Sequence, residues 1–307
     1  MGTIQRVLIT GAGGFIGKPT IEAALKRADW EIHAVVSGMH PYSLSNECCV
    51  HVADLSNAEQ CASLINNVKP DILIHLAWSV GDNRTECSVQ NLIWVENSLR
   101  LLRLFFGCGG RRFVFAGSRT EYGEPKRQAE KRDAPPARCI YGESKHAFEQ
   151  VCENFCAQKG YSFVSARIFT VYGEKEQRRY PLIPAAIDAF NRGQSFLCRE
   201  PDTVWDFIHV EDVANALVQI AASDYCGIVN VGTGKPHLLR NVCTEIADKM
   251  GRPELLSFVE NGDASVLVAD PTVLREKIGY QCQVDFSKGI DRTIAWWRSQ
   301  EFCLDGR

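Results

Sequence analysis

Tyr141 and Lys145 are two residues whose types and spacing could support proton transfer. On a helix, side chains four positions apart lie on the same face, one turn from each other. A free phenol has a pKa of about 10, too high for ready proton exchange at neutral pH. A lysine ammonium about 4 Å away, at an effective dielectric constant of about 20, supplies roughly 4 kcal/mol, enough to lower that pKa by about 3 units. The pair is therefore a candidate acid/base device, although the same spacing also occurs on ordinary solvated helices.

A second chemical signal is a glycine-rich turn near the N-terminus, Gly11-Ala-Gly-Gly14-Phe-Ile-Gly17. Residues 6–10 before it read as a short buried strand, and residues 18–27 after it have a helical pattern. Glycines permit positive φ and close approach of the backbone, and a helix N-terminus presents free N–H groups to an anion. The spacing is Gly-x-x-Gly-x-x-Gly, not the Gly-x-Gly-x-x-Gly of the common fingerprint. Strand, turn and helix together predict a cradle for the pyrophosphate of a dinucleotide.

The elements that must position these residues alternate through the first half of the chain. Strands are predicted at 6–10, 30–36, 49–53, 71–77, 112–116 and 162–167, with helices between them, notably at 56–67, 91–106 and 141–159. Such alternation predicts parallel strands joined by right-handed crossovers, with ligands at the carboxyl ends of the strands. We therefore expect an α/β fold, a Rossmann-like doubly wound parallel sheet.

The pattern becomes less regular after residue 168. Helices are predicted at 181–192, 241–250, 271–278 and 288–298, and one more strand at 228–231. We expect a dinucleotide-binding domain over residues 1–168, to which about 204–235 return. A smaller, interleaved C-terminal substrate-binding lobe is expected over 169–203 and 236–307.

The composition is ordinary for a globular enzyme, with 307 residues, 45% hydrophobic and 23% charged. A formal net charge of -3 argues against a nucleic-acid partner. No apolar run approaches the roughly 18 residues of a membrane span, and no secretory signal is recognised, so a cytoplasmic location is expected. The 13 cysteines are scattered without a Cys-x-x-Cys pair. We expect reduced thiols and no metal site.

With these features in place, the chain resembles the extended short-chain dehydrogenase/reductase family of nucleotide-sugar epimerases, dehydratases and reductases. The resemblance rests on motifs in the same order: Thr10-Gly-Ala-Gly-Gly-Phe-Ile-Gly17, Asp54-Leu55, His75-Leu-Ala77, Ser118 with Tyr141 and Lys145, Trp205-Asp-Phe-Ile-His-Val-Glu-Asp-Val213, and Asn230-Val-Gly-Thr-Gly234.

The resemblance implies roles for the catalytic trio. Tyr141 would be the general acid/base at the reacting sugar oxygen, and Ser118 would hydrogen-bond the same oxygen. Lys145 would hold the nicotinamide ribose and lower the pKa of the tyrosine. The implied cofactor contacts are Gly11, Gly14, Phe15, Ile16, Gly17, Ser37, Asp54, Leu55, Leu76, Ala77, Trp78, Tyr141, Lys145 and Ile168.

The residues after Ser118 bear on the choice of reaction. The 4,6-dehydratases of the family resemble one another in a Thr-Asp-Glu run whose acidic pair drives elimination, whereas this chain has Ser118-Arg119-Thr120. The run from Gly117 to Gly123 is instead similar to the Gly-Ser-x-x-Glu-Tyr-Gly of some 4-keto-6-deoxy sugar reductases. The resemblance thus favours hydride transfer to the 4-keto group of a nucleotide-linked deoxysugar. A redox-neutral NAD-dependent epimerase is the alternative, and a non-catalytic cofactor sensor is a remote one.

The cofactor subtype depends on the end of the second predicted strand. In NAD enzymes an acidic residue about 20 positions beyond the glycine turn usually binds the ribose hydroxyls. Here that strand ends at Val36-Ser37-Gly38, and the small, uncharged Ser37 would not repel a 2′-phosphate. NADP is therefore the expected cofactor, with NAD as the alternative.

Two departures from the family pattern concern the diphosphate of the substrate. Thr170 stands where the family usually has Asn, and Trp205 where it often has Arg. Two arginines of the substrate lobe, at 178 and 179, are candidates to compensate. By the same analogy, helices 91–106 and 141–159 form a homodimer interface. The expected substrate-side residues are Ser79, Arg119, Thr120, Thr170, Arg178, Arg179 and Trp205.

Overall fold

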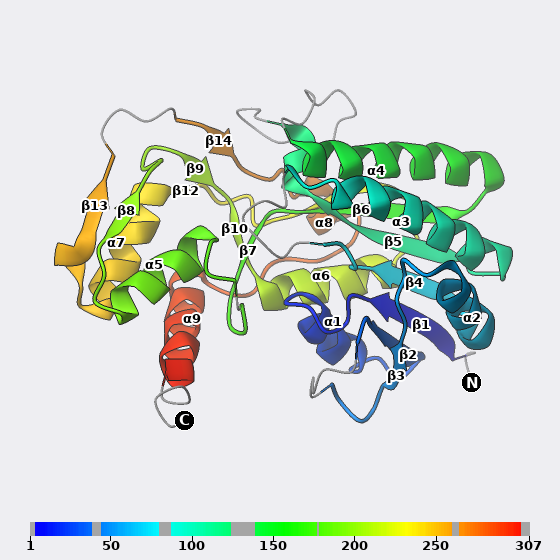
Figure 1. The fold of residues 1–307 in the computed structure, drawn as a ribbon. Helices are drawn as coiled ribbons and strands as arrows, with labels where there is room; N and C mark the ends of the chain where they lie inside the picture. Colours follow the sequence, from blue (N-terminus) through cyan, green and yellow to red (C-terminus); the bar gives the residue numbers. More distant parts are fainter. Residues whose placement is uncertain are drawn as a thin grey trace.

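The centre of the molecule is a parallel sheet with helices on both faces, and a smaller lobe lies at one end (Figure 1). The computed structural model describes residues 4–38, 44–79, 87–123, 139–176, 178–259 and 264–301. Within these ranges the sheet has seven strands in the order β11-β6-β5-β4-β1-β2-β3. Their bounds are β1 (Gln5–Thr10), β2 (Trp30–Val36), β3 (Cys49–Val52), β4 (Ile72–His75), β5 (Arg112–Ser118), β6 (Ser162–Ile168) and β11 (Gly227–Val231).

The strand order of the sheet reverses at one point, beside β1. Every neighbouring pair is parallel, and β1 pairs with both β2 and β4, so the order reverses beside β1. The central strands β4 and β5 are buried along their whole length, as their continuous apolar runs require. The doubly wound α/β sheet expected from the sequence is confirmed. Crevices for ligands form where such an order reverses, at the carboxyl ends of the strands.

Helices cover the two faces of the sheet with separate hydrophobic clusters. On one face α1 (Gly17–Ala24) packs against α6 (Val210–Ala222), with Ile21, Val213 and Leu217 in the cluster. The other face is covered by α2 (Ala58–Val68), α3 (Gln90–Gly107) and α4 (Ile140–Lys159), which bring Phe105 and Phe148 against it. No described helix combines the length and the apolar character that a bilayer-spanning segment needs.

The smaller lobe has a hydrophobic cluster of its own. It is built from α5 (Leu182–Asn191), α7 (Leu239–Met250) and α9 (Phe286–Glu301), with the strand pair β8 (Phe196–Cys198) and β13 (Leu256–Phe258) beside them. Short strands connect this lobe to the sheet. They are β7 (Thr170–Tyr172) paired with β10 (Phe207–His209), and β9 (Val204–Trp205) between β12 (His237–Leu238) and β14 (Val266–Leu267). The short helix α8 (Thr272–Glu276) follows β14 and contacts β11.

Candidate active site

The glycine turn between β1 and α1 leaves room only for backbone. Gly11 has a φ of +69°, and a Cβ there would lie 2.8 Å from the nitrogen of Ala77. A Cβ on Gly17 would lie 2.2 Å from the carbonyl oxygen of Gly11. Ile16, the N-cap of α1, makes no side-chain cap hydrogen bond, so the first N–H groups of α1 face the turn without a side-chain acceptor from that residue. This geometry fits a pyrophosphate at a helix N-terminus.

The other expected cofactor residues follow the carboxyl ends of neighbouring strands. Ser37 comes directly after β2 and is exposed, and Asp54 follows β3. Hydrogen bonds from Ser56 hold the pKa of the Asp54 carboxyl below its usual value, so it is ionised at neutral pH. Leu76, Ala77, Trp78 and Ser79 follow β4, and Ile168 ends β6.

A buried histidine fixes the segment after β4. His75 Nδ1 lies 2.7 Å from Thr10 Oγ1 and its Nε2 lies 2.9 Å from Ser98 Oγ. The same Thr10 oxygen accepts from the backbone N–H of Ala77 at 3.2 Å. Burial lowers the pKa of His75 to about 3, so the ring is neutral. His75 is therefore a packing and hydrogen-bonding residue that ties β4 to β1 and α3.

Ser118 ends β5 and caps the short helix η2 (Arg119–Tyr122). Its hydroxyl oxygen accepts from the Thr120 N–H at 3.2 Å and from the Thr120 hydroxyl at 2.9 Å. In return, the side chain of Glu121 accepts from the Ser118 N–H at 2.5 Å, which completes a capping box. The Ser118 hydroxyl also forms a hydrogen bond with the Tyr141 phenol, which acts to lower the pKa of that phenol.

Tyr141 and Lys145 lie on the same face of α4, as their spacing predicted. The Lys145 nitrogen is 5.7 Å from the centroid of the Tyr141 ring. It donates to the carbonyl oxygen of Ala116 at 2.6 Å and lies over the ring of Trp78 at 4.3 Å. Ser118, Tyr141 and Lys145 thus converge at the carboxyl end of β5.

The expected lowering of the Tyr141 pKa is not met in this arrangement. Burial raises the pKa of the phenol to about 12, and the hydrogen bond from Ser118 only partly opposes this rise. Burial also lowers the pKa of Lys145 to about 7, because its ammonium is enclosed by aromatic rings with one carbonyl acceptor among the described residues. Half-neutral lysine supplies little positive charge, so desolvation outweighs the attraction that the spacing suggested.

A buried ion network behind the trio was not foreseen from the sequence. Arg167 of β6 donates from Nε to Glu149 of α4 at 3.0 Å, and its Nη2 pairs with the other oxygen of that carboxylate. Its Nε is also 3.3 Å from Glu121 of η2. All three side chains are almost fully buried. The sequence signal was present in Glu121 and in the Arg of the Arg167-to-Gly173 run, but nothing local linked the two.

The charges of this network are unequal. Burial, reinforced by the neighbouring Glu149 carboxylate, raises the pKa of Glu121 well above its ordinary value. Burial also opposes ionisation of Glu149, but hydrogen bonds from His146 and Arg167 outweigh it and lower the pKa of Glu149 to about 2. The Arg167 guanidinium therefore contacts one carboxyl group that stays ionised, Glu149, and one that is easily protonated, Glu121.

Among the expected substrate-side residues, Arg119 and Trp205 contact each other, and Arg178 lies near Tyr141. The guanidinium of Arg119 stacks over the ring of Trp205 at 4.5 Å, and Trp205 also packs on Phe207. Arg178 lies close enough to Tyr141 to lower its pKa slightly, and is held by a bidentate pair with Glu176. Trp205 thus packs in the interior on one side and contacts the Arg119 guanidinium with its ring.

The remaining substrate-side residues differ in their surroundings. The hydroxyl of Thr170 is buried without a partner in the described residues. Arg179 is half-exposed and pairs with Asp188 of α5 at 3.4 Å, so the structure does not bring it to the trio. Thr120 faces Ser118, and Ser79 is exposed after β4.

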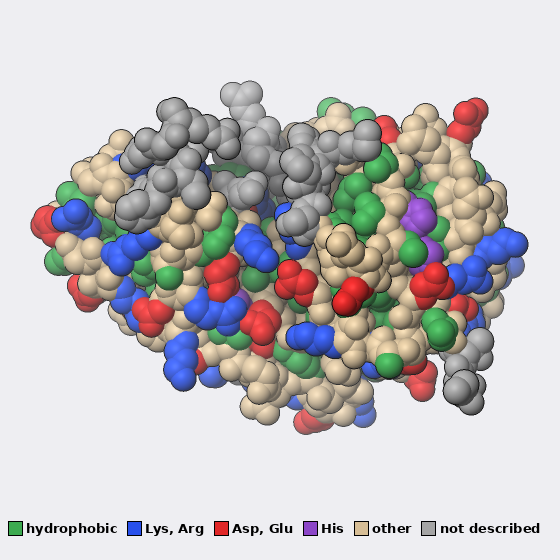
Figure 2. Space-filling model, turned by 90° about the horizontal axis from the view of Figure 1, so that it is seen from below, with side chains coloured by type: hydrophobic (Ala, Val, Ile, Leu, Met, Phe, Trp, Pro, Cys, Tyr) green, Lys and Arg blue, Asp and Glu red, His purple; other side chains and the backbone are tan. Residues whose placement is uncertain are grey.

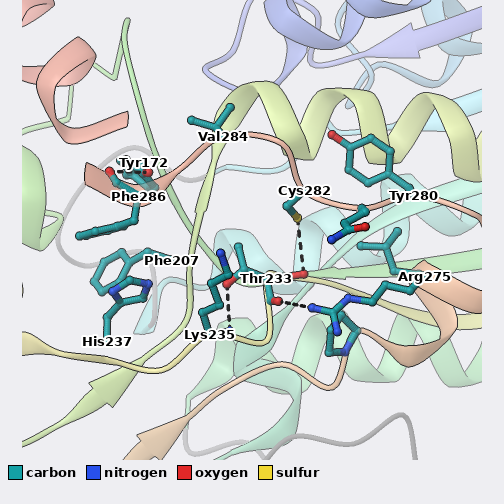
Figure 3. A pocket seen from close by; sticks show the side chains of 14 residues that line it. Tyr172, Phe207, Thr233, Lys235, His237, Arg275, Tyr280, Cys282, Val284 and Phe286 are labelled. Carbon is teal, nitrogen blue, oxygen red and sulfur yellow. Dashed lines mark hydrogen bonds between the residues drawn. The ribbon is translucent and has the colours of Figure 1, made fainter. Parts of the chain in front are cut away.

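A separate small cavity of about 60 Å³ lies between the sheet and the lobe (Figure 3). Tyr172, Phe207, His237 and Phe286 form one wall, and Thr233 and Arg275 lie opposite. Ligand pockets usually measure about 300 to 1,000 Å³, so this cavity is too small for a sugar nucleotide. Its lining contains none of Ser118, Tyr141 and Lys145.

Asp206 explains the two late motifs in structural terms. Its carboxylate accepts from the Thr233 N–H at 3.0 Å, the Gly234 N–H at 2.7 Å and the Ala269 N–H at 3.2 Å. The Trp205 run and the Gly232-to-Gly234 turn are therefore joined by one buried carboxylate, which holds the loop after β11 against the lobe.

Comparison with known proteins identifies the family of this chain. The model of the NAD dependent epimerase/dehydratase family matches residues 7–232. UDP-glucose 4-epimerase of Azospirillum brasilense is 28% identical over 328 aligned residues, which cover 96% of this chain and 93% of that protein. ADP-L-glycero-D-manno-heptose-6-epimerase of Thiobacillus denitrificans is 26% identical, in an alignment that covers 75% of this chain and 74% of that protein.

Solved structures share the fold over almost the whole chain. UDP-glucose 4-epimerase from Thermus thermophilus, in complex with NAD, superimposes with a TM-score of 0.83 at 26% identity, covering 95% of this chain and 99% of that one. A dTDP-glucose 4,6-dehydratase from Streptomyces venezuelae with NAD bound has a TM-score of 0.84 at 22% identity, covering 97% and 98%. Because the family model matches residues 7–232, well over half of its length, this chain belongs to the NAD dependent epimerase/dehydratase family of the extended short-chain dehydrogenases/reductases.

Proposed function

We propose that this enzyme reduces the 4-keto group of a nucleotide-linked deoxysugar, with Tyr141 as the proton donor. The observation that carries the proposal is the convergence of Ser118, Tyr141 and Lys145 at the same edge of the sheet as the glycine turn. Because the Tyr141 pKa is raised to about 12, the phenol is protonated at neutral pH. A protonated phenol is the form that a general acid needs in the reducing direction.

The residues beside Ser118 argue against dehydration. Arg119 and Thr120 occupy the positions of the acidic pair that elimination requires. Glu121, the nearest carboxyl in the chain, is buried, accepts from the Ser118 N–H and faces Arg167. It is therefore engaged in structural contacts with Ser118 and Arg167.

Each residue has a defined task in the proposed reaction. When bound, the nicotinamide cofactor supplies the hydride. The glycine turn and the N-terminus of α1 would hold its pyrophosphate, with Asp54 and Leu55 beside the adenine. The Ser118 hydroxyl donates a hydrogen bond toward the carbonyl oxygen as negative charge grows there. The Tyr141 phenol then transfers its proton to that oxygen.

NADP is the proposed cofactor and NAD the alternative. Ser37 is exposed and uncharged at the end of β2, so a 2′-phosphate there meets no carboxylate from this residue. Against this, the family model is NAD dependent, and the Thermus thermophilus structure contains NAD. Binding of the two cofactors, compared by thermal shift at equal concentrations, distinguishes them.

The leading rival is a redox-neutral epimerase that retains NAD. It is supported by the names of the relatives, UDP-glucose 4-epimerase and ADP-L-glycero-D-manno-heptose-6-epimerase. For the substrate, a nucleotide-linked sugar is common to both proposals. Thr170 and Trp205 stand where the family usually has residues that contact the diphosphate. Arg119 and Arg178 are therefore the proposed partners of the diphosphate in this chain.

The lobe organisation is also part of the proposal. We propose residues 1–168 with about 204–235 as the cofactor domain and 169–203 with 236–307 as the substrate lobe. In support, β11 pairs with β6 and α6 packs under the sheet, whereas α5, α7 and α9 share a separate cluster.

The decisive experiment adds a 4-keto sugar nucleotide and reduced cofactor to the purified protein. Stoichiometric oxidation of NADPH, lost in Tyr141→Phe, is the expected result. General acid catalysis contributes about 100- to 10,000-fold, so the variant should lose turnover by that factor while it still binds cofactor. Tyr161→Phe, on a tyrosine that stacks with Phe106, is the control and should keep full activity.

Two other outcomes would redirect the proposal. Protein that carries bound NAD and converts a sugar nucleotide to its epimer with no net cofactor oxidation would establish the epimerase. A Tyr141→Phe variant with undiminished turnover would remove the phenol from the mechanism.

A further inference from the structure

Four side chains with metal-ligating atoms gather on one face of the outer strands β2 and β3. Residues two apart on a strand point to the same face, which places Glu31 with His33 and Cys49 with His51. The register pairs His33 with Cys49 across the two strands. One ligand atom each of Glu31, His33 and Cys49 lies within 4.8 Å of the others. In Figure 2, histidine side chains reach the surface near this end of the sheet, with acidic side chains close by.

His33 is the group that needs an explanation. The residue is 8% exposed, and its Nε2 is buried without a hydrogen-bond partner among the described residues. That nitrogen is 3.5 Å from a carboxylate oxygen of Glu31, too far for a good hydrogen bond. Two ligand atoms of a tetrahedral zinc ion, each about 2.1 Å from the metal, are themselves about 3.5 Å apart. The gap between these two atoms is therefore the one a metal ion would span.

The second histidine supports the same reading. His33 Nδ1 is 2.9 Å from His51 Nε2, and the two rings are stacked. When Nδ1 donates to His51, the lone pair of His33 resides on Nε2 and points at Glu31. A metal-bound histidine ordinarily donates its other ring N–H to a neighbouring acceptor in this way.

We propose that Glu31, His33 and Cys49 form a binding site for a zinc-class divalent ion, with His51 as the residue that orients His33. Thiolate and carboxylate would balance the charge of the ion, and the Cys49 thiol releases its proton on binding. Water fills the fourth position of the tetrahedron. Arg6 of β1, which the register pairs with Glu31, donates to the carbonyl of Val68 at 2.8 Å.

The site is separate from the active site. His33 lies three residues before the end of β2, about 10 Å from the carboxyl edge where the cofactor residues lie. Its ligands come from β3, the edge strand, and from β2 beside it. Bound metal would therefore pin the edge strand to the sheet, and its effect is on stability and not on the chemical step.

The test uses the full chain, stripped of metal with a chelator and then titrated with Zn²⁺ against a chromophoric competitor. We expect one tight site per chain and a higher unfolding temperature with Zn²⁺. Substitution with Co²⁺ should produce a thiolate-to-metal charge-transfer band. Cys49→Ser should abolish this band and weaken Zn²⁺ binding by about 100-fold or more, and His51→Leu by about 10- to 100-fold.

The matched control is Cys226→Ser, which removes an exposed thiol beside β11, at the opposite edge of the same sheet. It should leave the cobalt band and the Zn²⁺ affinity unchanged. The proposal is overturned if the wild-type chain gives no thiolate band, or if the band survives in Cys49→Ser. Cys49 is exposed, so its replacement by serine leaves the fold intact.

Discussion

Burial sets the protonation states of Tyr141, Lys145 and His75. Tyr141 is held as a phenol, Lys145 is close to half-protonated at neutral pH, and His75 is neutral, each because desolvation disfavours the charged form. A phenol kept protonated at the end of β5 is ready to donate. The positive charge that would stabilise the phenolate afterwards depends on Lys145, so a more polar environment around its ammonium would increase the acidity of Tyr141.

His75 gives a stability prediction with a definite sign. The pKa of His75 is about 3 in the folded chain, against an ordinary value of 6.5 that applies to the unfolded chain. Between these two pH values the unfolded chain therefore binds one more proton than the folded chain. Stability therefore rises with pH over this window. From pH 4.5 to 6.5 we expect His75 to contribute about 2 to 3 kcal/mol to the increase in the free energy of unfolding.

Urea unfolding at several pH values measures this contribution. His75→Gln should show a flatter pH dependence than the wild type between pH 4.5 and 6.5. Comparing the two proteins cancels the other groups that titrate in the same range. Parallel curves for the two proteins would show that His75 does not titrate in this way.

The sequence predicted which candidate catalytic groups meet but not their electrostatics. Helical spacing was enough to place Tyr141 and Lys145 together, and the motif order placed Ser118 beside them. Their pKa values depend on Trp78, Phe115 and other distant residues that enclose them, which no local pattern reports. The same holds for Glu121 and Arg167, which lie 46 positions apart in the sequence. It also holds for Glu31 and Cys49, whose strands had been predicted but whose register had not.

At the level of elements, the turn from β1 to α1 requires glycine for two distinct reasons. Gly11 and Gly251 have nearly the same positive φ, +69° and +68°. A Cβ on Gly11 would strike the backbone of Ala77, whereas nothing lies within 4 Å of one on Gly251. Both alanine variants should therefore lose about 1 to 2 kcal/mol for the backbone conformation. Only Gly11→Ala should also lose dinucleotide binding.

Calorimetric titration with cofactor, together with chemical unfolding, separates the two effects. Equal cofactor affinity in Gly11→Ala and Gly251→Ala would show that the turn does not cradle the dinucleotide.

Arg167 links the elements that carry the trio. It connects β6 to η2 through Glu121 and to α4 through Glu149. Removing the guanidinium leaves the buried carboxyl groups of Glu121 and Glu149 without their cation. Arg167→Met should therefore lower the free energy of unfolding by about 3 to 5 kcal/mol. Arg111→Met is the control, because this exposed arginine makes only a 3.4 Å pair with Asp71 among the described residues and should cost under about 1 kcal/mol.

Urea denaturation compares the two arginine variants directly. Similar losses in both would mean that the buried network contributes no more than a surface pair.

The long elements could be read from the sequence because each has a strong local pattern. The strands from β1 to β6 and the helices α2 to α5 appear within a few residues of their predicted bounds. Helix α6 was missed, although Val210–Ala222 carries a clear apolar pattern, because its first residues were read only as a family motif. The strands β7 to β10 and β12 to β14 have two or three residues each, and pairing across the chain creates them.

In the whole molecule, two buried aspartates on neighbouring segments hold the lobe against the sheet. Asp206 fixes the turn after β11, and Asp212 of α6 accepts from Tyr280 at 2.6 Å, Gln283 at 2.8 Å and Val284 at 2.9 Å. The segment from residue 280 to 284 runs directly into α9 of the lobe. The relative position of sheet and lobe therefore depends on hydrogen bonds to α6 and its preceding strand.

The surface of α3 and α4 carries the prediction that concerns assembly. These helices pack side by side on one face of the sheet (Figure 1). Their outer surfaces expose large apolar side chains, with Leu92 58%, Val151 53% and Phe155 37% accessible. Exposed apolar groups of this size on adjacent helices are typical of protein interfaces. We expect a homodimer through these helices, which would bury them in a bundle with the partner's pair.

Sedimentation equilibrium of Phe155→Glu tests the interface. A charge placed in an apolar contact should convert the dimer to a monomer. Leu197→Glu is the matched control, because Leu197 is 44% exposed on β8 in the lobe, away from α3 and α4. A wild-type chain that sediments as a monomer would exclude the dimer outright. A Phe155→Glu dimer as tight as the wild type would move the contact to another surface, since a buried unpaired carboxylate costs several kcal/mol at an interface.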